Sequence, residues 1–207
     1  MAGTRAGKTS DRRVARTHGA LREALISLIS ERGWDAISVQ DVCDRANIGR
    51  STFYAHFASK EKLLISGFDE LRRALRAQAG MASDARTWPF GFVRGLIEHA
   101  HENQRLFRAV IGKRSGLVVQ RHFRHLLIEL VAEELTDDGI AMIRRDAAAH
   151  YIAGALFELL NWWIDSRSPL APSELEAMFR ELTTPVLGVA RSSAQNRRPV
   201  ETKVPAK

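Results

Sequence analysis

Side chains suited to binding a nucleic acid gather in one short stretch near the N-terminus. Between Arg50 and Lys60, two cations that can neutralise phosphates, stand several hydrogen-bonding groups: Ser51, Thr52, Tyr54 and His56. Cations bind backbone phosphates, whereas hydroxyl and imidazole groups can reach base edges in a groove. The stretch therefore indicates contact with nucleic acid, provided that the local structure presents these groups on one surface.

Two short helices joined by a tight turn are expected to position these groups. Ser38 is a good N-cap, and Asp41 stands where a capping box needs it, at the start of a helix reaching Ala46. Asn47–Gly49 should break that helix, because Asn and Gly tolerate the left-handed backbone of a sharp turn. A second helix is expected over Arg50–Phe57, followed by a third that begins at Ser59.

The second helix should bury Phe53 and Phe57, which lie four residues apart, and leave its polar groups outside. A steep pair of helices joined in this way is a helix-turn-helix, whose second helix is shaped to enter the DNA major groove. Spacing alone fits a small helical core with a solvated face equally well.

The motifs T-F-Y-A-H-F, ending at Phe57, and S-K-E-K-L, beginning at Ser59, resemble the DNA-binding segment of the tetracycline-repressor (TetR) family of bacterial regulators. The resemblance covers about residues 14 to 65. It implies DNA contacts at the matching positions, which are Gln40, Arg50, Ser51, Thr52, Tyr54, His56 and Lys60. Where the family often has Ala-Gly-Val before the recognition helix, this chain has Ala46-Asn47-Ile48, and Asn should preserve the turn.

The charge of the chain is unevenly distributed. Residues 1–62 carry 11 Lys and Arg against 7 Asp and Glu, residues 63–190 carry 15 against 16, and residues 191–207 carry 5 against 1. This division suits a nucleic-acid-binding module joined to a nearly neutral body with another task.

Composition narrows the class of protein further. The one cysteine, Cys43, permits no internal disulfide and is expected to pack in a core. We find no secretory signal and no apolar run long enough to span a membrane, so a cytoplasmic location is expected. The sequence predicts neither a cofactor nor a membrane partner.

Helical periodicity predicts an all-α fold with two domains and a tail at each end of the sequence. We expect a disordered basic tail at residues 1–9, a helix-turn-helix domain at 10–58, a helical ligand-binding and dimerisation domain at 59–190, and a second disordered basic tail at 191–207. The body helices are expected at about 89–101, 103–112, 115–135, 140–166 and 173–190. Ser173 and Glu176 predict a capping box for the last of these.

No nucleotide-binding or hydrolase motif stands in the body, so an enzyme is not predicted. His122 and His125 could share a metal, but no carboxylate or cysteine stands at ligand spacing and no metal site is predicted. In the resembled family, the helical body generally holds a pocket for a small effector. The resemblance therefore implies an effector for this chain, but it does not identify the molecule. Aromatic side chains suit an apolar pocket, and the candidate walls are Phe92, Phe107, Phe123 and Trp163.

The helix predicted over 140–166 has an apolar arc wider than one core contact requires, which suggests a second neighbour. Paired with the last helix, it could form a four-helix bundle across a two-fold axis of a homodimer, as the resemblance also implies. The expected interface residues are Ile152, Leu156, Leu159, Leu175, Phe179 and Leu182. Alternatively, a larger hydrophobic core within a single chain would bury the same apolar residues without a dimer.

These features predict a ligand-responsive regulator that binds a palindromic double-stranded DNA operator as a dimer, most often a repressor, and is released by a small molecule. The alternative is an all-α interaction protein whose helix-turn-helix no longer reads DNA sequence.

Overall fold

The computed structural model describes residues 4–79, 88–112, 116–135, 142–166 and 170–195 of the 207-residue chain. These segments are helical and contain no β-strand, which confirms the predicted all-α fold. The elements are α1 (Thr4–Arg32), the 3₁₀ turn η1 (Trp34–Ala36), α2 (Val39–Ala46), α3 (Arg50–His56), α4 (Lys60–Ala79), α5 (Phe92–Glu102), α6 (Gln104–Ile111), α7 (Gly116–Glu134), α8 (Met142–Asp165) and α9 (Pro172–Gln195).

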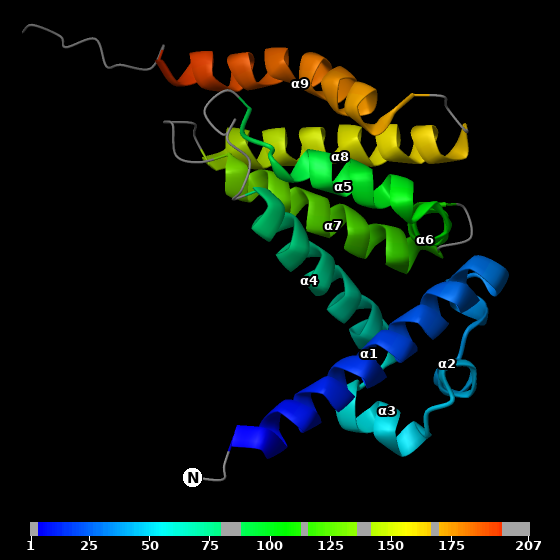
Figure 1. Cartoon of the computed structure of the whole chain (residues 1–207). Helices are drawn as coiled ribbons and strands as arrows, with labels where there is room; N and C mark the ends of the chain where they lie inside the picture. The colour runs from blue at the N-terminus through cyan, green and yellow to red at the C-terminus, as the bar shows by residue number, and fades with distance from the viewer. Residues whose placement is uncertain (1–3, 80–87, 113–115, 136–141, 167–169, 196–207) are drawn as a thin grey trace, which may run out of the picture.

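Elements α1 to α3 form a head below the stacked helices of the body, and the head contacts the body through α1 and η1 (Figure 1). The head is held together by a small core that includes Leu25, Ile29, Val42, Phe53 and Phe57, all of them buried. Cys43 is buried there as well, and burial raises the pKa of its thiol. The cysteine is therefore a packing residue, as its place on an apolar helix face predicts.

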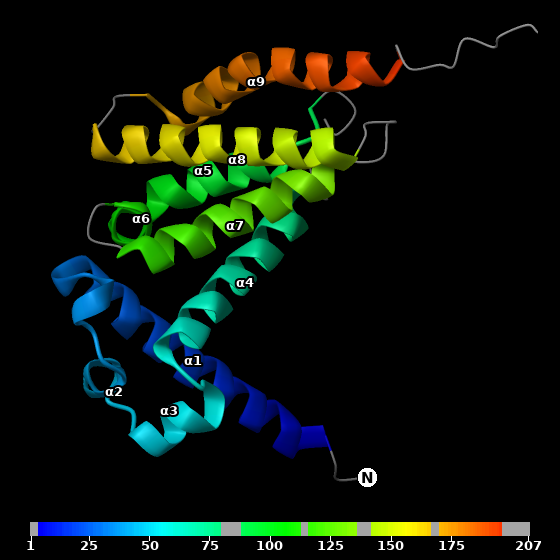
Figure 2. The ribbon, with the colours of Figure 1, turned by 180° about the vertical axis from the view of Figure 1, so that it is seen from behind.

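Helix α4 connects the head to the body, and it crosses the space between them in both views (Figures 1 and 2). Its first turn packs in the head through Leu63 and Leu64, whereas Leu75 is buried near its far end. Two arginines of α4, Arg72 and Arg76, form ion pairs with glutamates of α7. The connecting helix is thus anchored both in the head and in the body.

The body stacks its helices in layers, with α8 lying between α7 on one side and α9 on the other (Figures 1 and 2). Helix α5 contacts α9 and α4, and α6 contacts α1 of the head as well as α7 and α8. No helix in the described segments combines the length and apolar character needed to span a membrane.

Helix α1 begins at Thr4, so the expectation of disorder at residues 1–9 is wrong for residues 4–9, and residues 1–3 lie outside the described residues. Extending a helix that is already nucleated costs little per residue, which explains why α1 continues into polar sequence. The same holds at the other end, where α9 continues to Gln195, five residues beyond its expected end. The rest of the basic tail, residues 196–207, lies outside the described residues.

The expectation of a capping box formed by Ser173 and Glu176 is also wrong. The backbone N–H of Ala171 instead donates to Glu174 Oε2 at 2.7 Å, and the helix begins with Pro172. Glu176 is buried and accepts a hydrogen bond from Arg94 Nε of α5 at 3.0 Å. Its carboxylate therefore joins two helices that are distant in sequence.

Most of the wide apolar arc of α8 is covered by the chain itself. Ile152 and Leu156 are fully buried in the protomer because α6, α7 and α9 all pack on this helix. Leu175 and Phe179 of α9 are likewise buried. These four residues were predicted at a dimer interface, and the structure places them in the protomer's own core, where a partner chain cannot reach them.

Candidate nucleic-acid interface and ligand pocket

The two helices of the candidate DNA-binding unit are fixed by local backbone chemistry. Asp41 N–H donates to Ser38 Oγ at 3.1 Å, and Ser38 N–H donates to Asp41 Oδ2 at 2.8 Å, which forms the expected capping box of α2. The hydrogen bonds from Ser38 lower the pKa of Asp41 to about 2. Asn47 ends α2 with φ of 52°, the left-handed conformation expected at this turn.

Helix α3 presents its polar side chains outward because Phe53 anchors the helix in the core. Phe53 is 0% exposed, whereas Tyr54 is 49% exposed. Arg50, Ser51 and Thr52 are exposed on the first turn of the same helix. The Arg50 guanidinium lies 5.8 Å from the centre of the Tyr54 ring, so these two groups share one surface.

Two other predicted DNA contacts lie beside this surface and are engaged within the head. Gln40 is exposed on α2, and its Nε2 donates to Asp44 Oδ1 at 2.6 Å. His56 is half-buried, with its ring 4.9 Å from that of His18 on α1. The predicted residues therefore differ: Arg50, Ser51, Thr52 and Tyr54 are exposed on α3, whereas Gln40 and His56 contact other residues of the head.

Lys60 has a position that sequence reasoning did not anticipate. Its ammonium group donates to the carbonyl oxygens of Trp34 at 2.8 Å and Ile37 at 2.6 Å, and it lies 4.4 Å from the centre of the Trp34 ring. Burial lowers the pKa of this lysine. Since an ammonium group has three N–H donors, one of them is left for a phosphate.

Arg45 is a further structural cation that the motif comparison missed. Its guanidinium makes two hydrogen bonds to the Glu31 carboxylate, at 2.8 and 2.7 Å, and one to Ser27 Oγ at 2.7 Å. These contacts lower the pKa of Glu31 to about 2, with the bond from Arg45 as the main cause. The clamp fixes α2 against α1 and therefore sets the position from which α3 is presented.

Three arginines on the N-terminal half of α1 extend the basic character of the head. Arg12, Arg13 and Arg16 are exposed. This end of α1 lies on the same side of the molecule as α3 (Figures 1 and 2). The head thus combines a polar recognition helix with a neighbouring cationic helix, as a nucleic-acid-binding surface requires.

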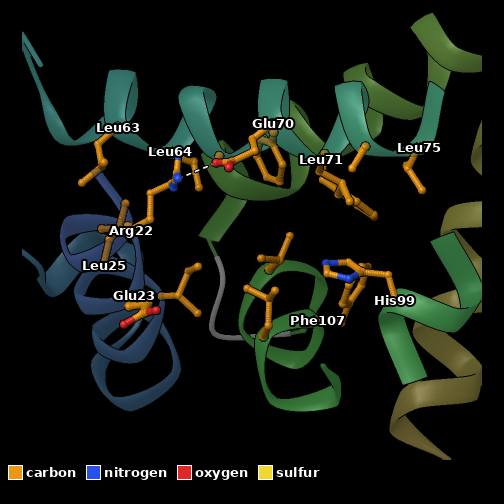
Figure 3. Close-up of a pocket in the computed structure, with 18 of the residues that line it drawn as sticks. Arg22, Glu23, Leu25, Leu63, Leu64, Glu70, Leu71, Leu75, His99 and Phe107 are labelled. Carbon is orange, nitrogen blue, oxygen red and sulfur yellow. Dashed lines mark ion pairs between the residues drawn. The ribbon is translucent and has the colours of Figure 1, made fainter. Parts of the chain in front are cut away.

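A pocket of about 440 Å³ opens between the head and the body, within the size range of small-molecule sites. Its walls come from α1, α4, α5, α6 and α7. Arg22 reaches from α1 to form an ion pair with Glu70 of α4, and the His99 ring projects from α5 into the space between the helices (Figure 3). The pocket is therefore shared by the two parts of the molecule.

The structure brings two of the four predicted wall residues to this pocket. Phe107 and Phe123 line it, and their rings pack edge to face with the ring centres 5.9 Å apart. Phe92 instead packs with Phe90 in the core, and Trp163 stacks on His101 while its Nε1 donates to Leu170 O at 3.0 Å. The sequence identified aromatic residues as a class, but their directions depend on helices that are far apart in the chain.

The histidines that suggested a weak metal pair are each engaged with a carboxylate. His122 Nε2 lies 2.7 Å from Glu61 Oε1, and His125 Nε2 lies 3.5 Å from Glu129 Oε1. Within the described residues, no group of three or more His, Cys, Asp or Glu side chains is placed to hold a metal ion.

Apolar side chains remain exposed along one stripe of α8 and one stripe of α9 in the described part of the protomer. On α8, Tyr151 is 62% exposed and Trp162 is 47% exposed, with Leu159 half-buried between them. On α9, Leu182 is 66% exposed and is flanked by half-buried Met178 and Val186. Leu159 and Leu182 are the two predicted interface residues that remain accessible.

Comparison with known proteins agrees with this architecture. Residues 21–66 match the family model described as bacterial regulatory proteins of the tetR family, and residues 87–185 match a transcriptional regulator C-terminal region. The chain belongs to the TetR family of bacterial regulatory proteins, which confirms the resemblance seen in its motifs.

Individual relatives cover the chain to different extents. An uncharacterised regulator of Bacillus subtilis, YxbF, is 43% identical over 58 residues, which are 28% of this chain and 15% of that protein. The repressor KstR2 of Mycobacterium tuberculosis is 35% identical over 107 residues, 46% of this chain and 49% of its own length. The chain thus spans at most about half the length of these relatives. The solved structure of a TetR regulator from Streptococcus agalactiae covers 86% of this chain and 98% of its own, at 26% identity and a TM-score of 0.60.

Proposed function

We propose that this protein is a transcriptional regulator that binds a palindromic double-stranded DNA operator as a homodimer, represses transcription, and is released by a small-molecule effector. The observation that carries the proposal is the surface of α3, where Arg50, Ser51, Thr52 and Tyr54 are exposed on a helix whose Phe53 is fully buried. The relative named KstR2 is a transcriptional repressor, which supports repression over activation. Binding to chromosomal DNA places the protein in the cytoplasm.

In this proposal α3 enters the major groove. Arg50 is suited to a guanine, because its fork-shaped guanidinium matches the two acceptors on that base. Ser51, Thr52 and Tyr54 contribute hydrogen bonds to bases or phosphates. Gln40 and His56 contact DNA from the edges of the surface, and Lys60 does so through its remaining N–H while it fixes the turn after α1.

The proposed dimer uses the two uncovered stripes on α8 and α9. Tyr151 and Trp162 give one stripe aromatic anchors, and Leu182 is the centre of the other. Exposed apolar surface of this kind marks an interaction site, and a two-fold axis would allow each stripe to meet its own copy. Two recognition helices related by that axis would reach half-sites roughly 34–36 Å apart.

Release requires an effector that binds the DNA-free conformation more tightly than the DNA-bound one, since equal affinity shifts nothing. Helix α4 suits the transmission, because its first turn belongs to the head while Arg72 and Arg76 tie it to α7. Movement of α4 relative to α7 would change the separation of the two recognition helices.

A footprint of the full-length protein on the DNA upstream of its own coding region tests the proposal. We expect protection of one near-palindrome at protein concentrations that leave the flanking DNA unprotected. Uniform weak retardation without a discrete protected site would instead support an interaction protein whose helix-turn-helix does not read sequence.

A further inference from the structure

We infer that the pocket between α1 and α4–α7 is the effector site, and that it takes an apolar, uncharged molecule whose single oxygen acceptor is bound by His99. The inference rests on the proposed function, because it names the site and the chemical class of the effector.

The location links ligand binding to the position of the head. Leu25 and Ile26 of α1 line the pocket from the head, and Phe107 and Phe123 line it from the body. A molecule in the pocket would contact both parts at once, so its affinity must depend on how α1 sits against the body. That dependence is the differential affinity that release of DNA requires.

The lining favours an apolar body without a charge. Most residues around the pocket are aliphatic or aromatic, among them Leu64, Phe68 and Leu71 of α4. The charged lining residues are Arg22, Glu23 and Glu70, of which Arg22 and Glu70 neutralise each other. An anionic group would therefore meet a lining of net negative charge and would lose hydration without gaining a free cation.

The hydrogen bonds of Asn103 determine which nitrogen of His99 carries the proton. Asn103 Nδ2 donates to the carbonyl oxygen of His99 at 3.0 Å, which fixes this end of the amide as the nitrogen, because a carbonyl can only accept. The same Nδ2 lies 3.2 Å from His99 Nδ1, so Nδ1 must be the acceptor. The neutral imidazole consequently carries its proton on Nε2.

The His99 ring packs edge to face on Phe107, with the ring centres 5.7 Å apart, and its Nε2–H has no hydrogen-bond partner in the described part of the chain. The ring projects into the pocket (Figure 3), so the donor can bind an oxygen acceptor of a ligand there. A ketone, ester or ether oxygen satisfies it without bringing a charge into the apolar space. Although the lining has a net negative charge, an ammonium group has only donors, so it cannot accept the hydrogen bond that Nε2–H offers.

Calorimetry on the full-length protein without DNA tests this site with methyl octanoate, octanoate and octylamine as probes. We expect methyl octanoate to bind most tightly, and His99→Phe, which keeps a flat ring but removes the donor, to weaken it roughly three- to tenfold. His101→Phe is the matched control, because His101 lies on the same helix and stacks on Trp163 outside the pocket. Equal binding by wild type and His99→Phe, or tighter binding of octanoate or octylamine, would overturn the inference.

Operator affinity with and without saturating methyl octanoate separates this inference from the proposed function. We expect the ester to weaken operator binding by wild type, and to do so less for His99→Phe at the same concentration. A wild-type protein that binds its operator but not the ester contradicts the pocket assignment alone. A protein that binds the ester through His99 but no operator contradicts the proposed function alone.

Discussion

The head and the body of this protein hold their polar side chains in different ways. In the head, Ser38 pairs with Asp41 within one helical turn, and the Arg45–Glu31 pair that joins α2 to α1 spans only 14 positions. In the body, Arg94 pairs with Glu176, a residue 82 positions away. Local pairs form whenever their short segment folds, whereas distant pairs form only when the whole body is assembled. The head can therefore present one fixed surface, while the shape of the pocket depends on every helix around it.

The largest effect is expected from a substitution in the body that abolishes DNA binding by the head. Leu182→Asp would place a charge in the proposed dimer stripe and should cost about 2 kcal/mol or more in dimerisation free energy. We expect sedimentation to show monomer and operator affinity to be lost, although Leu182 lies on α9, far from α3 (Figure 1). Leu117→Asp is the control, because Leu117 is 86% exposed on α7 outside both stripes. A Leu182→Asp protein that stays dimeric would show that the interface lies elsewhere.

The next change tests whether the core of the head supports the recognition surface. Phe53→Ala removes a fully buried ring and should lower the free energy of unfolding by about 3–5 kcal/mol. Denaturant titration measures this loss, and operator binding should fall with it because α3 loses its anchor. Tyr54→Phe keeps the ring on the same helix and should leave stability unchanged. Similar stability of Phe53→Ala and wild type would mean that α3 does not depend on this packing.

A smaller effect is expected from the surface of α3 itself. Arg50→Ala should cost roughly 1–3 kcal/mol of operator binding and relax base preference at one position of each half-site. Its fold should be intact, because Arg50 is exposed. Binding to a panel of single-base operator variants measures the preference, and Arg105→Ala, an exposed arginine of α6, serves as control. Unchanged preference in Arg50→Ala would remove this residue from base reading.

The smallest effect concerns the capping box of α2. The pKa of Asp41 is lowered to about 2 in the folded protein, so its ionised form stabilises the fold above the ordinary pKa of an aspartate. That contribution is lost as the pH falls through about 2. The Asp41→Asn variant should therefore have a lower melting temperature than wild type at neutral pH. The difference between the two melting temperatures should shrink as the pH is lowered from about 4. A gap that is constant down to acid pH would show that the carboxylate charge does not matter there.

Sequence reasoning was most successful where structure is local. The capping box at Ser38, the left-handed Asn47 and the buried Phe53 all follow from residues within a turn or two of one another. The width of the apolar arc on α8 was also read correctly, but periodicity does not say which chain covers it. Ile152 and Leu156 proved to be covered by α6, α7 and α9 of the same protomer.

The candidate pocket was harder to predict for the same physical reason. Arg22, Glu70 and His99 belong to three different helices, and nothing in their spacing along the chain indicates that they meet. Glu176 fitted a local capping pattern, yet its buried carboxylate is held by Arg94 from α5. The position of Lys60 in the motif predicts a phosphate contact, whereas the structure shows that two of its three N–H donors bind carbonyl oxygens of the head. Long-range packing decides these side chains.

The ratio of affinities for the footprinted operator and for a scrambled duplex of the same composition tests the central claim most directly. Both constants should be measured on the full-length protein at one fixed salt concentration, because phosphate contacts alone make binding depend on salt. We predict an operator affinity at least roughly a thousandfold tighter, as expected for a protein that reads base edges through a pair of recognition helices. A ratio near one would contradict the assignment of this protein as a sequence-specific regulator.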